Sequence, residues 1–167
     1  MAINLEDMLS FGVFLAICIL AGSAGAIFKP DSWYCSIKKP RWCPPDWLFP
    51  LAWSCLYITI AMAGWLVWRV AGFSGAEIAF TVYGLHMILN FAWSPIFFGL
   101  RRIDWAFFEI ILFWLTLVAT IFLFYGIKPT AAYLLMPYLV WATFAGALNF
   151  AVWQLNKGTL SKPFRTT

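Results

Sequence analysis

The side chains in this sequence best suited to specific chemistry are its 11 tryptophans and a few isolated ionisable groups. No nucleophile–base pair, paired carboxylates or phosphate-binding loop is visible. The sequence therefore predicts no hydrolytic or phosphoryl-transfer centre, and no catalytic residue is assigned on these grounds. The tryptophans become the candidates for a binding surface, because indole offers a large flat face for contact.

Two ionisable side chains, His86 and Glu109, lie inside long apolar runs, and each has two interpretations. His86 could ligate a metal or carry a proton, but a lone histidine without a partner motif favours a hydrogen bond between helices. Glu109 could line a pocket mouth, but pairing with an arginine is favoured, because an ionised acid facing lipid is costly. Cys35 and Cys43 share one connection without neighbouring histidines, so no metal site is predicted.

Three aromatic segments position these groups: WCPPDWLFPLAW at 42–53, NFAWSPIFFGLRR at 90–102 and PYLVWATFAGALNFAVW at 137–153. In the first, Pro50 is expected one turn into a helix, where its missing donor would kink the helix. Phe49, Trp53 and Tyr57 then follow at four-residue spacing and form one aromatic face.

The other two segments also gather polar and aromatic side chains on one helix face. In the second, Asn90 and Trp93 lie together, and Pro95 is expected to kink the helix. In the third, one face carries Trp141, Ala145, Leu148 and Asn149. Several tryptophans lie deep inside their segments, so they exceed what an interfacial aromatic belt requires.

Composition indicates an integral membrane protein. Hydrophobic residues make up 63% of the chain and charged residues 11%, against about 45–50% and about 25% in soluble domains. So few charges cannot cover a water-facing surface. The net charge of +4 is not a nucleic-acid signal, because the basic residues lie in gaps between apolar runs, and no nucleic-acid partner is expected.

We predict an all-α fold, a bundle of five transmembrane helices forming a single membrane domain over residues 1–167. A spanning helix needs about 20 apolar residues, and the alternation typical of a transmembrane β-barrel is absent. The predicted spans are 8–28, 47–68, 78–100, 105–127 and 130–155, with a first connection at 29–46 and a tail at 156–167.

The basic residues predict the orientation of these spans. The first and third connections and the tail hold nine lysines and arginines: Lys29, Lys38, Lys39, Arg41, Arg101, Arg102, Lys157, Lys162 and Arg165. The other connections hold only Arg69 and Lys128. The positive-inside rule therefore places the C-terminus in the cytoplasm and the N-terminus outside.

Over roughly residues 20–156 the sequence resembles the translocator protein / tryptophan-rich sensory protein family. The resemblance rests on the tryptophan-proline-proline entrance at 42–45, the asparagine-led third span ending in Phe-Phe-Gly, and the Pro-Tyr-Leu-x-Trp start of the fifth span. The connection Lys29-Pro30-Asp31-x-Trp33-Tyr34 and the pair Lys39-Pro40 also fit this family.

The resemblance implies a five-helix bundle, often homodimeric, in which the first connection acts as a lid over a pocket. It implies that the ligands are tetrapyrroles such as protoporphyrin IX and haem, with no cofactor required. The function would be that of a receptor or sensor in porphyrin homeostasis and stress response. Two alternatives are a transporter of porphyrins or other amphipathic molecules and a light-dependent porphyrin-degrading enzyme. The absence of internal repeats argues against the transporter.

The resemblance also implies which residues bind the ligand. Trp53 and Trp141 match the tryptophans linked to porphyrin photochemistry, and they would be the reactive pair if the protein degrades porphyrin. The expected ligand-binding residues are Ser23, Ala26, Trp42, Trp47, Phe49, Trp53, Asn90, Trp105, Leu112, Trp141, Ala145 and Leu148. Stacking on indole would stabilise a flat macrocycle by about 0.5–1.5 kcal/mol per contact beyond burial.

Two further expectations concern the pocket rim and the lipid. Porphyrin propionates need cations, which the basic residues of 29–46 could supply. The sterol motif of animal members needs a tyrosine and a basic residue, where this chain has Phe150 and Gln154. Membrane lipid is an expected partner, whereas sterol recognition is not expected.

Overall fold

The structure is a computed structural model that describes residues 5–160, with side chains through residue 158, and every regular element in that range is helical. The elements are α1 (Leu5–Ile27), α2 (Ser32–Ser36), α3 (Leu48–Ala71), α4 (Glu77–Ser94), the π-helix η1 (Pro95–Gly99), α5 (Ile103–Ile127), α6 (Pro129–Leu134) and α7 (Met136–Leu160). Within the described residues, the all-α prediction is confirmed.

Proline interrupts the span predicted over 78–100. The α-helix α4 runs only to Ser94, because Pro95 has no N–H to donate to the preceding turn. The chain continues as η1, in which the Leu100 N–H donates to the Pro95 carbonyl five residues back, at 2.8 Å. A wider turn of this kind absorbs the lost hydrogen bond without ending the helical path.

A second proline divides the span predicted over 130–155. Pro137 cannot donate to the Tyr133 carbonyl, and the helix breaks at Leu135 into the short α6 and the long α7. The segment Pro129–Gly158 as a whole is still long and apolar enough to cross a membrane, as are α1, α3 and α5. These four are the candidate spans of the described chain.

The polar composition of α4 sets it apart from the four candidate spans. Its 18 residues include Glu77, His86 and Asn90, which lower its mean hydropathy. It is not among the helices that qualify as spans by length and composition. The five-span count therefore stays a prediction.

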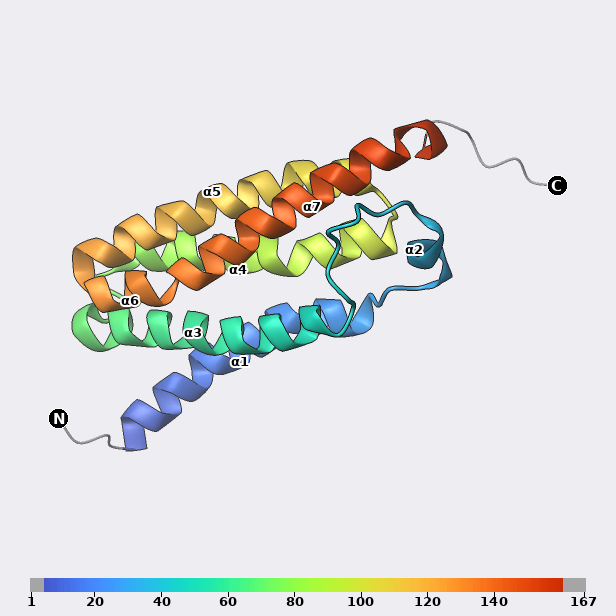
Figure 1. The fold of residues 1–167 in the computed structure, drawn as a ribbon. Coiled ribbons are helices and arrows are strands. Elements are labelled where there is room, and N and C mark those ends of the chain that lie inside the picture. Colours follow the sequence, from blue (N-terminus) through green and yellow to red (C-terminus); the bar gives the residue numbers. More distant parts are fainter. Residues whose placement is uncertain (1–4, 161–167) are drawn as a thin grey trace.

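The long helices lie side by side in one elongated bundle (Figure 1). α4 packs against α1 and α5, α5 packs along α7, and α3 packs along α1. The N-terminal part of α1 projects away from the bundle. The ends of the described chain lie at opposite ends of the bundle, with α6 at one and α2 with its flanking loops at the other (Figure 1).

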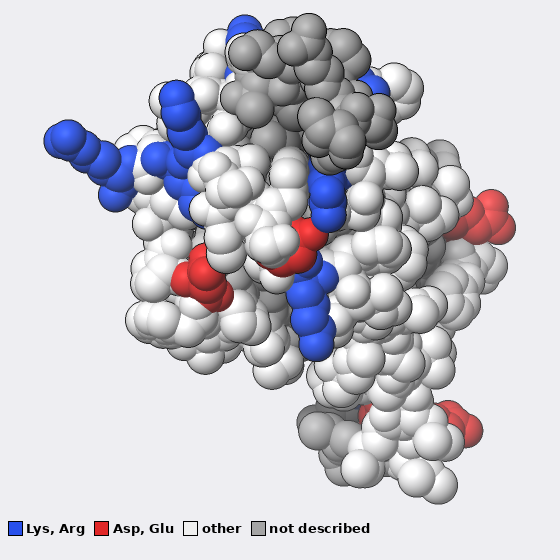
Figure 2. All heavy atoms as spheres, turned by 90° about the vertical axis from the view of Figure 1, so that its right-hand side faces the viewer, with Lys and Arg blue, Asp and Glu red and all other residues white. Residues whose placement is uncertain are grey.

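Basic side chains gather at the α2 end of the bundle (Figure 2). Of the nine residues counted above, those within the described chain belong to segments at this end: Lys29, Lys38, Lys39, Arg41, Arg101, Arg102 and Lys157. Lys162 and Arg165 lie outside the described residues. Arg69 and Lys128 flank helix ends at the opposite end of the bundle. The charge asymmetry is thus spatial, while the side of the membrane that each end faces stays a prediction.

Glycine permits the close approach of α1 to α3. A Cβ atom built on Gly64 would lie 2.8 Å from the Phe14 ring and 3.3 Å from the Tyr83 ring. Both residues are buried, and each is only 3% exposed. Even one methyl group would therefore push α1 and α4 away from α3.

We expect Gly64→Ala to destabilise the bundle by about 1–3 kcal/mol, the usual cost of overpacking a dense core. Thermal unfolding in detergent, followed by circular dichroism, measures this as a lower midpoint. Gly84→Ala is the matched control, because a Cβ there meets nothing within 4 Å. Equal midpoints for the two variants would contradict the packing of α1 on α3.

Candidate functional site

Aromatic side chains from three segments, the first connection, α3 and α7, meet in one set of ring contacts. The Trp53 ring stacks on Tyr57 at 5.4 Å between centroids and meets Tyr138 edge to face at 5.9 Å. Phe49 meets Trp141 at 5.9 Å. We call the following set the aromatic cluster: Trp42, Phe49, Trp53, Tyr57, Tyr138, Trp141 and Phe144.

The sequence around 42–53 explains how these rings are held. The Leu48 N–H donates to the Pro45 carbonyl at 3.0 Å, and α3 begins at Leu48. Pro50 therefore falls in the first turn, where N–H groups have no helical partner. Pro50 therefore removes no helical hydrogen bond and gives α3 no reason to kink there. Trp53 lies on a continuous α-helix.

A chain of buried hydrogen bonds lies directly beneath the aromatic cluster. The Tyr57 hydroxyl bonds Asn90 Oδ1 at 2.8 Å, and Asn90 Nδ2 bonds the Tyr138 hydroxyl at 2.7 Å. The same hydroxyl lies 2.9 Å from His86 Nε2. His86 Nδ1 lies 3.2 Å from both the Phe113 carbonyl and the Thr116 hydroxyl. We call this the polar chain, and it ties α3, α4, α5 and α7 together.

The structure tests the interpretations of the two isolated ionisable side chains, His86 and Glu109. His86 makes hydrogen bonds between helices, as the structural interpretation expects. The expected pairing of Glu109 with an arginine is wrong, because both its carboxyl oxygens are buried without a hydrogen-bond partner among the described residues. Glu109 lies on the side of α5 that carries Phe113 and Thr116, and this side packs on α4.

Five of the twelve expected ligand-binding residues meet in or against the aromatic cluster: Trp42, Phe49, Trp53, Asn90 and Trp141. Ala145 packs against the hydrophobic core that includes Tyr138. Leu148 is buried in a neighbouring core with Ile103 and Val152. Half-buried Ser23 donates to its own helix at Leu20.

The remaining expected residues face outward. Trp47, Trp105 and Leu112 are 64%, 61% and 55% exposed, and Ala26 is exposed at the end of α1. The structure therefore does not gather them around the aromatic cluster. The expected set also omitted Tyr57, which the sequence places on one face with Phe49 and Trp53, and two residues of α7, Tyr138 and Phe144. The three-residue spacing of these two from Trp141 on one helix is the sequence signal that would have found them.

Several contacts hold the first connection against the α2 end of the bundle. Asp31 caps α2 by accepting the Tyr34 N–H at 3.1 Å and pairs with Arg101 at 2.9 Å. The capping bond and the nearby guanidinium lower the pKa of Asp31, so the cap stays ionised at neutral pH and is lost only when pH falls through that lowered value. Tyr34 packs on Phe97, and burial raises its pKa.

Asn156 on α7 makes the most specific attachment of the connection. Its Nδ2 donates to the Lys38 carbonyl at 2.9 Å, and its Oδ1 accepts the Lys38 N–H at 3.0 Å. Only 4% of Asn156 is exposed. The Asn156 amide thus pairs with both the backbone N–H and the backbone carbonyl of Lys38, as a neighbouring β-strand would.

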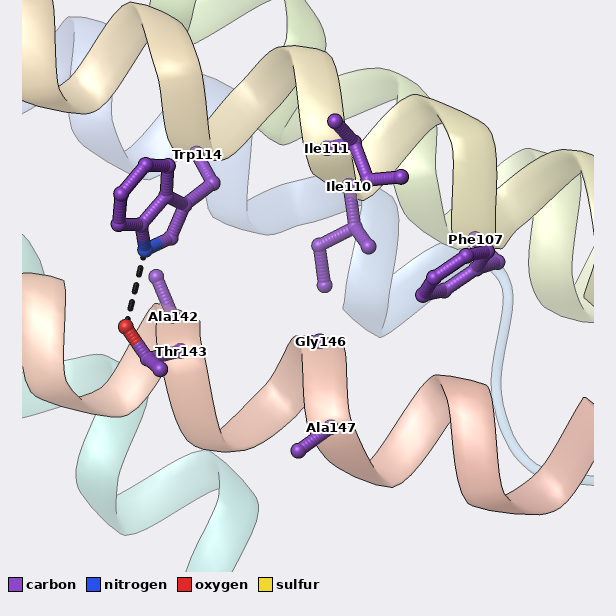
Figure 3. Close-up of a pocket in the computed structure, with 8 residues that line it drawn as sticks. All are labelled: Phe107, Ile110, Ile111, Trp114, Ala142, Thr143, Gly146 and Ala147. Carbon is purple, nitrogen blue, oxygen red and sulfur yellow. Dashed lines mark hydrogen bonds between the residues drawn. The ribbon is translucent and has the colours of Figure 1, made fainter.

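A separate pocket of about 210 Å³ opens between α5 and α7 (Figure 3). The Trp114 Nε1 donates to the Thr143 hydroxyl at 2.9 Å near one end, and Phe107 lies near the other. The lining is Phe107, Ile110, Ile111, Trp114, Ala142, Thr143, Gly146 and Ala147. None of the twelve expected ligand-binding residues lines it. We call it the α5–α7 groove.

We expect Asn156→Ala to loosen the first connection without unfolding the helices, because the substitution removes both bonds to Lys38. Amide hydrogen exchange should rise over residues 33–41. Gln154→Ala, an exposed change on the same turn of α7, is the control. Unchanged exchange in Asn156→Ala would show that the ring contacts and the Asp31–Arg101 pair hold the connection without Asn156.

The sequence matches the TspO/MBR family over residues 14–154. It is 42% identical to Protein CrtK of Rhodobacter capsulatus over 89% of this chain and 93% of that protein. It is 40% identical to a tryptophan-rich sensory protein of Cereibacter sphaeroides over 90% of this chain and 93% of that protein. A translocator protein of Sus scrofa is 36% identical over 89% and 86%. The chain is therefore a multi-pass integral membrane protein that belongs to the TspO/MBR family.

Proposed function

We propose that this protein is a membrane receptor for tetrapyrroles such as protoporphyrin IX and haem, and that it takes part in porphyrin homeostasis and the stress response. The observation that carries the proposal is the aromatic cluster. It brings three tryptophans, from the first connection, α3 and α7, into one set of ring contacts, and the connection that supplies Trp42 also carries basic residues. The printed name of the 40% identical relative, a sensory protein, agrees with a receptor role.

The ligand would enter by displacing the first connection, which acts as a lid. Trp42 and Phe49 close the cluster by edge contacts with Phe144 and Trp141. A flat macrocycle can replace such edge contacts with stacking at little net cost, because each ring keeps an aromatic neighbour. Trp141 Nε1 is buried without a hydrogen-bond partner among the described residues, so it is available to an acceptor atom on the ligand.

The basic rim supplies charges for propionates, although its members differ in availability. Lys39 Nζ donates to the Tyr34 carbonyl at 2.6 Å and lies over the Tyr34 ring, so it is already engaged. Lys38 and Arg41 are the better candidates on the same connection. His86 is 1% exposed with both ring nitrogens hydrogen-bonded. Haem would therefore be held by its ring and propionates and not by this histidine.

We further propose that α4 is a fifth spanning helix. It packs against both α1 and α5, and its polar residues His86 and Asn90 point into the polar chain and not toward lipid. The two ends of the described chain lie at opposite ends of the bundle, as an odd number of spans requires (Figure 1). The basic α2 end would face the cytoplasm. The homodimer expected for the family is also a proposal, which the mass of the protein in lipid nanodiscs would test.

A dark titration with protoporphyrin IX, followed by tryptophan quenching and porphyrin absorbance, tests the proposed pocket. We expect saturable one-site binding, weakened about two- to tenfold in Kd by Trp53→Leu or Trp141→Leu, because each removes a stacking face. Trp114→Leu in the α5–α7 groove is the matched control and should leave Kd unchanged. Weakening only by the control would move the site to the groove, and no saturation would favour a transporter.

The rim makes a separate prediction. Lys38→Gln combined with Arg41→Gln should weaken the binding of protoporphyrin IX more as salt is lowered, because the lost attraction is electrostatic. The dimethyl ester of protoporphyrin IX, which lacks the propionate charges, should bind the double variant and the parent protein equally. Lys128→Gln, at the opposite end, is the control. Equal affinity of the double variant and the parent at every salt concentration would exclude propionate recognition by this rim.

A further inference from the structure

The polar chain has a fixed direction, which follows from one carbonyl. The Phe113 carbonyl can only accept, so His86 Nδ1, 3.2 Å away, carries the imidazole proton of the neutral ring. His86 Nε2 is then an acceptor. The Tyr138 hydroxyl, at 2.9 Å, donates its only proton to that nitrogen.

The rest of the chain follows from that assignment. Since the Tyr138 oxygen has spent its proton on His86, it accepts from the Asn90 amide nitrogen at 2.7 Å. Asn90 Oδ1 therefore faces Tyr57 and accepts the Tyr57 hydroxyl proton at 2.8 Å. Every proton in the chain points from Tyr57 toward the Phe113 carbonyl. Tyr138 thus donates to a base, whereas Tyr57 donates to an amide.

Trp53 connects this chain to the aromatic cluster. Its ring touches two tyrosines, Tyr57 by stacking at 5.4 Å and Tyr138 by an edge at 5.9 Å between centroids. An indole that has lost an electron can take one from either phenol at such contact. A phenol that gives up an electron becomes strongly acidic, so it needs a nearby base to take its proton. Tyr138 has the imidazole of His86 within proton-transfer distance, and Tyr57 has only an amide oxygen.

We propose that Trp53, Tyr138 and His86 form a relay that repairs oxidised Trp53. A one-electron oxidant takes an electron from Trp53 and leaves an indole radical cation. Tyr138 passes one electron to that indole, while its hydroxyl proton moves to His86 Nε2. The products are neutral Trp53, a neutral Tyr138 phenoxyl radical, protonated His86 and the reduced oxidant, so charge and electrons balance.

The relay would protect a buried binding surface from its own ligand. The physiological oxidant is of the class of electronically excited aromatic macrocycles, and in this respect the inference rests on the proposed function. Light absorbed by a ligand against Trp53 would otherwise leave a radical on the ring that holds the ligand. Tyr138 is fully buried, at 0% exposure, and His86 is at 1%, so the phenoxyl radical is shielded from water and solutes.

The relay can be tested without any ligand, which separates it from tetrapyrrole binding. A short ultraviolet flash ionises tryptophans in the detergent-solubilised protein, and transient absorption follows indole radicals and the phenoxyl radical. The contribution of Trp53 is the difference between the parent protein and Trp53→Phe. We expect this difference to show an indole radical that decays as a phenoxyl radical appears, more slowly in D2O than in H2O.

Variants then assign the roles. Tyr138→Phe should abolish the phenoxyl signal that depends on Trp53 and prolong the indole radical. His86→Gln keeps a hydrogen-bond acceptor for Tyr138 but removes the base, so it should slow the transfer and reduce its isotope effect. Tyr57→Phe should leave the transfer in place. Tyr125→Phe, on the exposed ring that pairs with Tyr133 far from Trp53, is the control.

Three results would overturn the relay. The first is a Trp53-dependent phenoxyl signal that survives Tyr138→Phe, the second is a transfer rate unaffected by His86→Gln, and the third is no phenoxyl radical at all in the parent protein. Circular dichroism and the unfolding midpoint of each variant show whether the helices remain folded. If a variant fails to fold, the solvent isotope effect in the parent still decides whether proton and electron move together. A protein that runs the relay but does not bind protoporphyrin IX would refute the proposed function alone.

Discussion

Tyr138 places its hydroxyl between His86 and Asn90 and its ring in edge-to-face contact with Trp53, and both arrangements depend on the same buried position. A polar group in the middle of an apolar bundle is costly unless its hydrogen bonds are made, because the surroundings offer no water to replace them. The polar chain meets that condition with partners from four helices. It therefore fixes how α3, α4, α5 and α7 sit relative to one another, and with them the rings above.

The position of α7 shows how this constraint reaches the basic end of the bundle. Tyr138 anchors the start of α7 to the polar chain, Asn149 bonds Trp93 and the Ile103 carbonyl midway, and Asn156 holds the Lys38 backbone at the far end. Three polar side chains along one helix thus connect the interior to the first connection. Because Asn156 bonds the connection to α7, a movement of the connection would act on the helix that also carries Trp141. The arrangement suits a receptor whose pocket is closed by its own loop.

The helices and the membrane class could be predicted from sequence, because length and apolar composition determine both. The proline effects were only partly predictable. Pro95 was expected to kink its helix and instead produces a π-helix, while Pro137 divides a span that reads as continuous. Pro50 was expected one turn into α3 and to kink it, but the helix begins at Leu48 and the proline lies in its first turn, where no helical hydrogen bond is lost.

The membership of the candidate site was predicted only in part. Trp53, Asn90 and Trp141 share the interior because they lie on faces that helical spacing identifies. Trp105 and Leu112 face outward on α5, because the side of a helix that packs inward depends on how neighbouring helices are rotated. The unpaired state of Glu109 and the direction of the polar chain depend on contacts between helices, which a single sequence does not specify.

An experimental structure of the protein with protoporphyrin IX in lipid would test the central claim most directly. The account predicts a macrocycle between Trp53 and Trp141, with Trp42 and Phe49 displaced and the propionates near Lys38 and Arg41. The polar chain beneath should be unchanged. A macrocycle seated in the α5–α7 groove against Trp114, with the aromatic cluster still closed, would contradict the account.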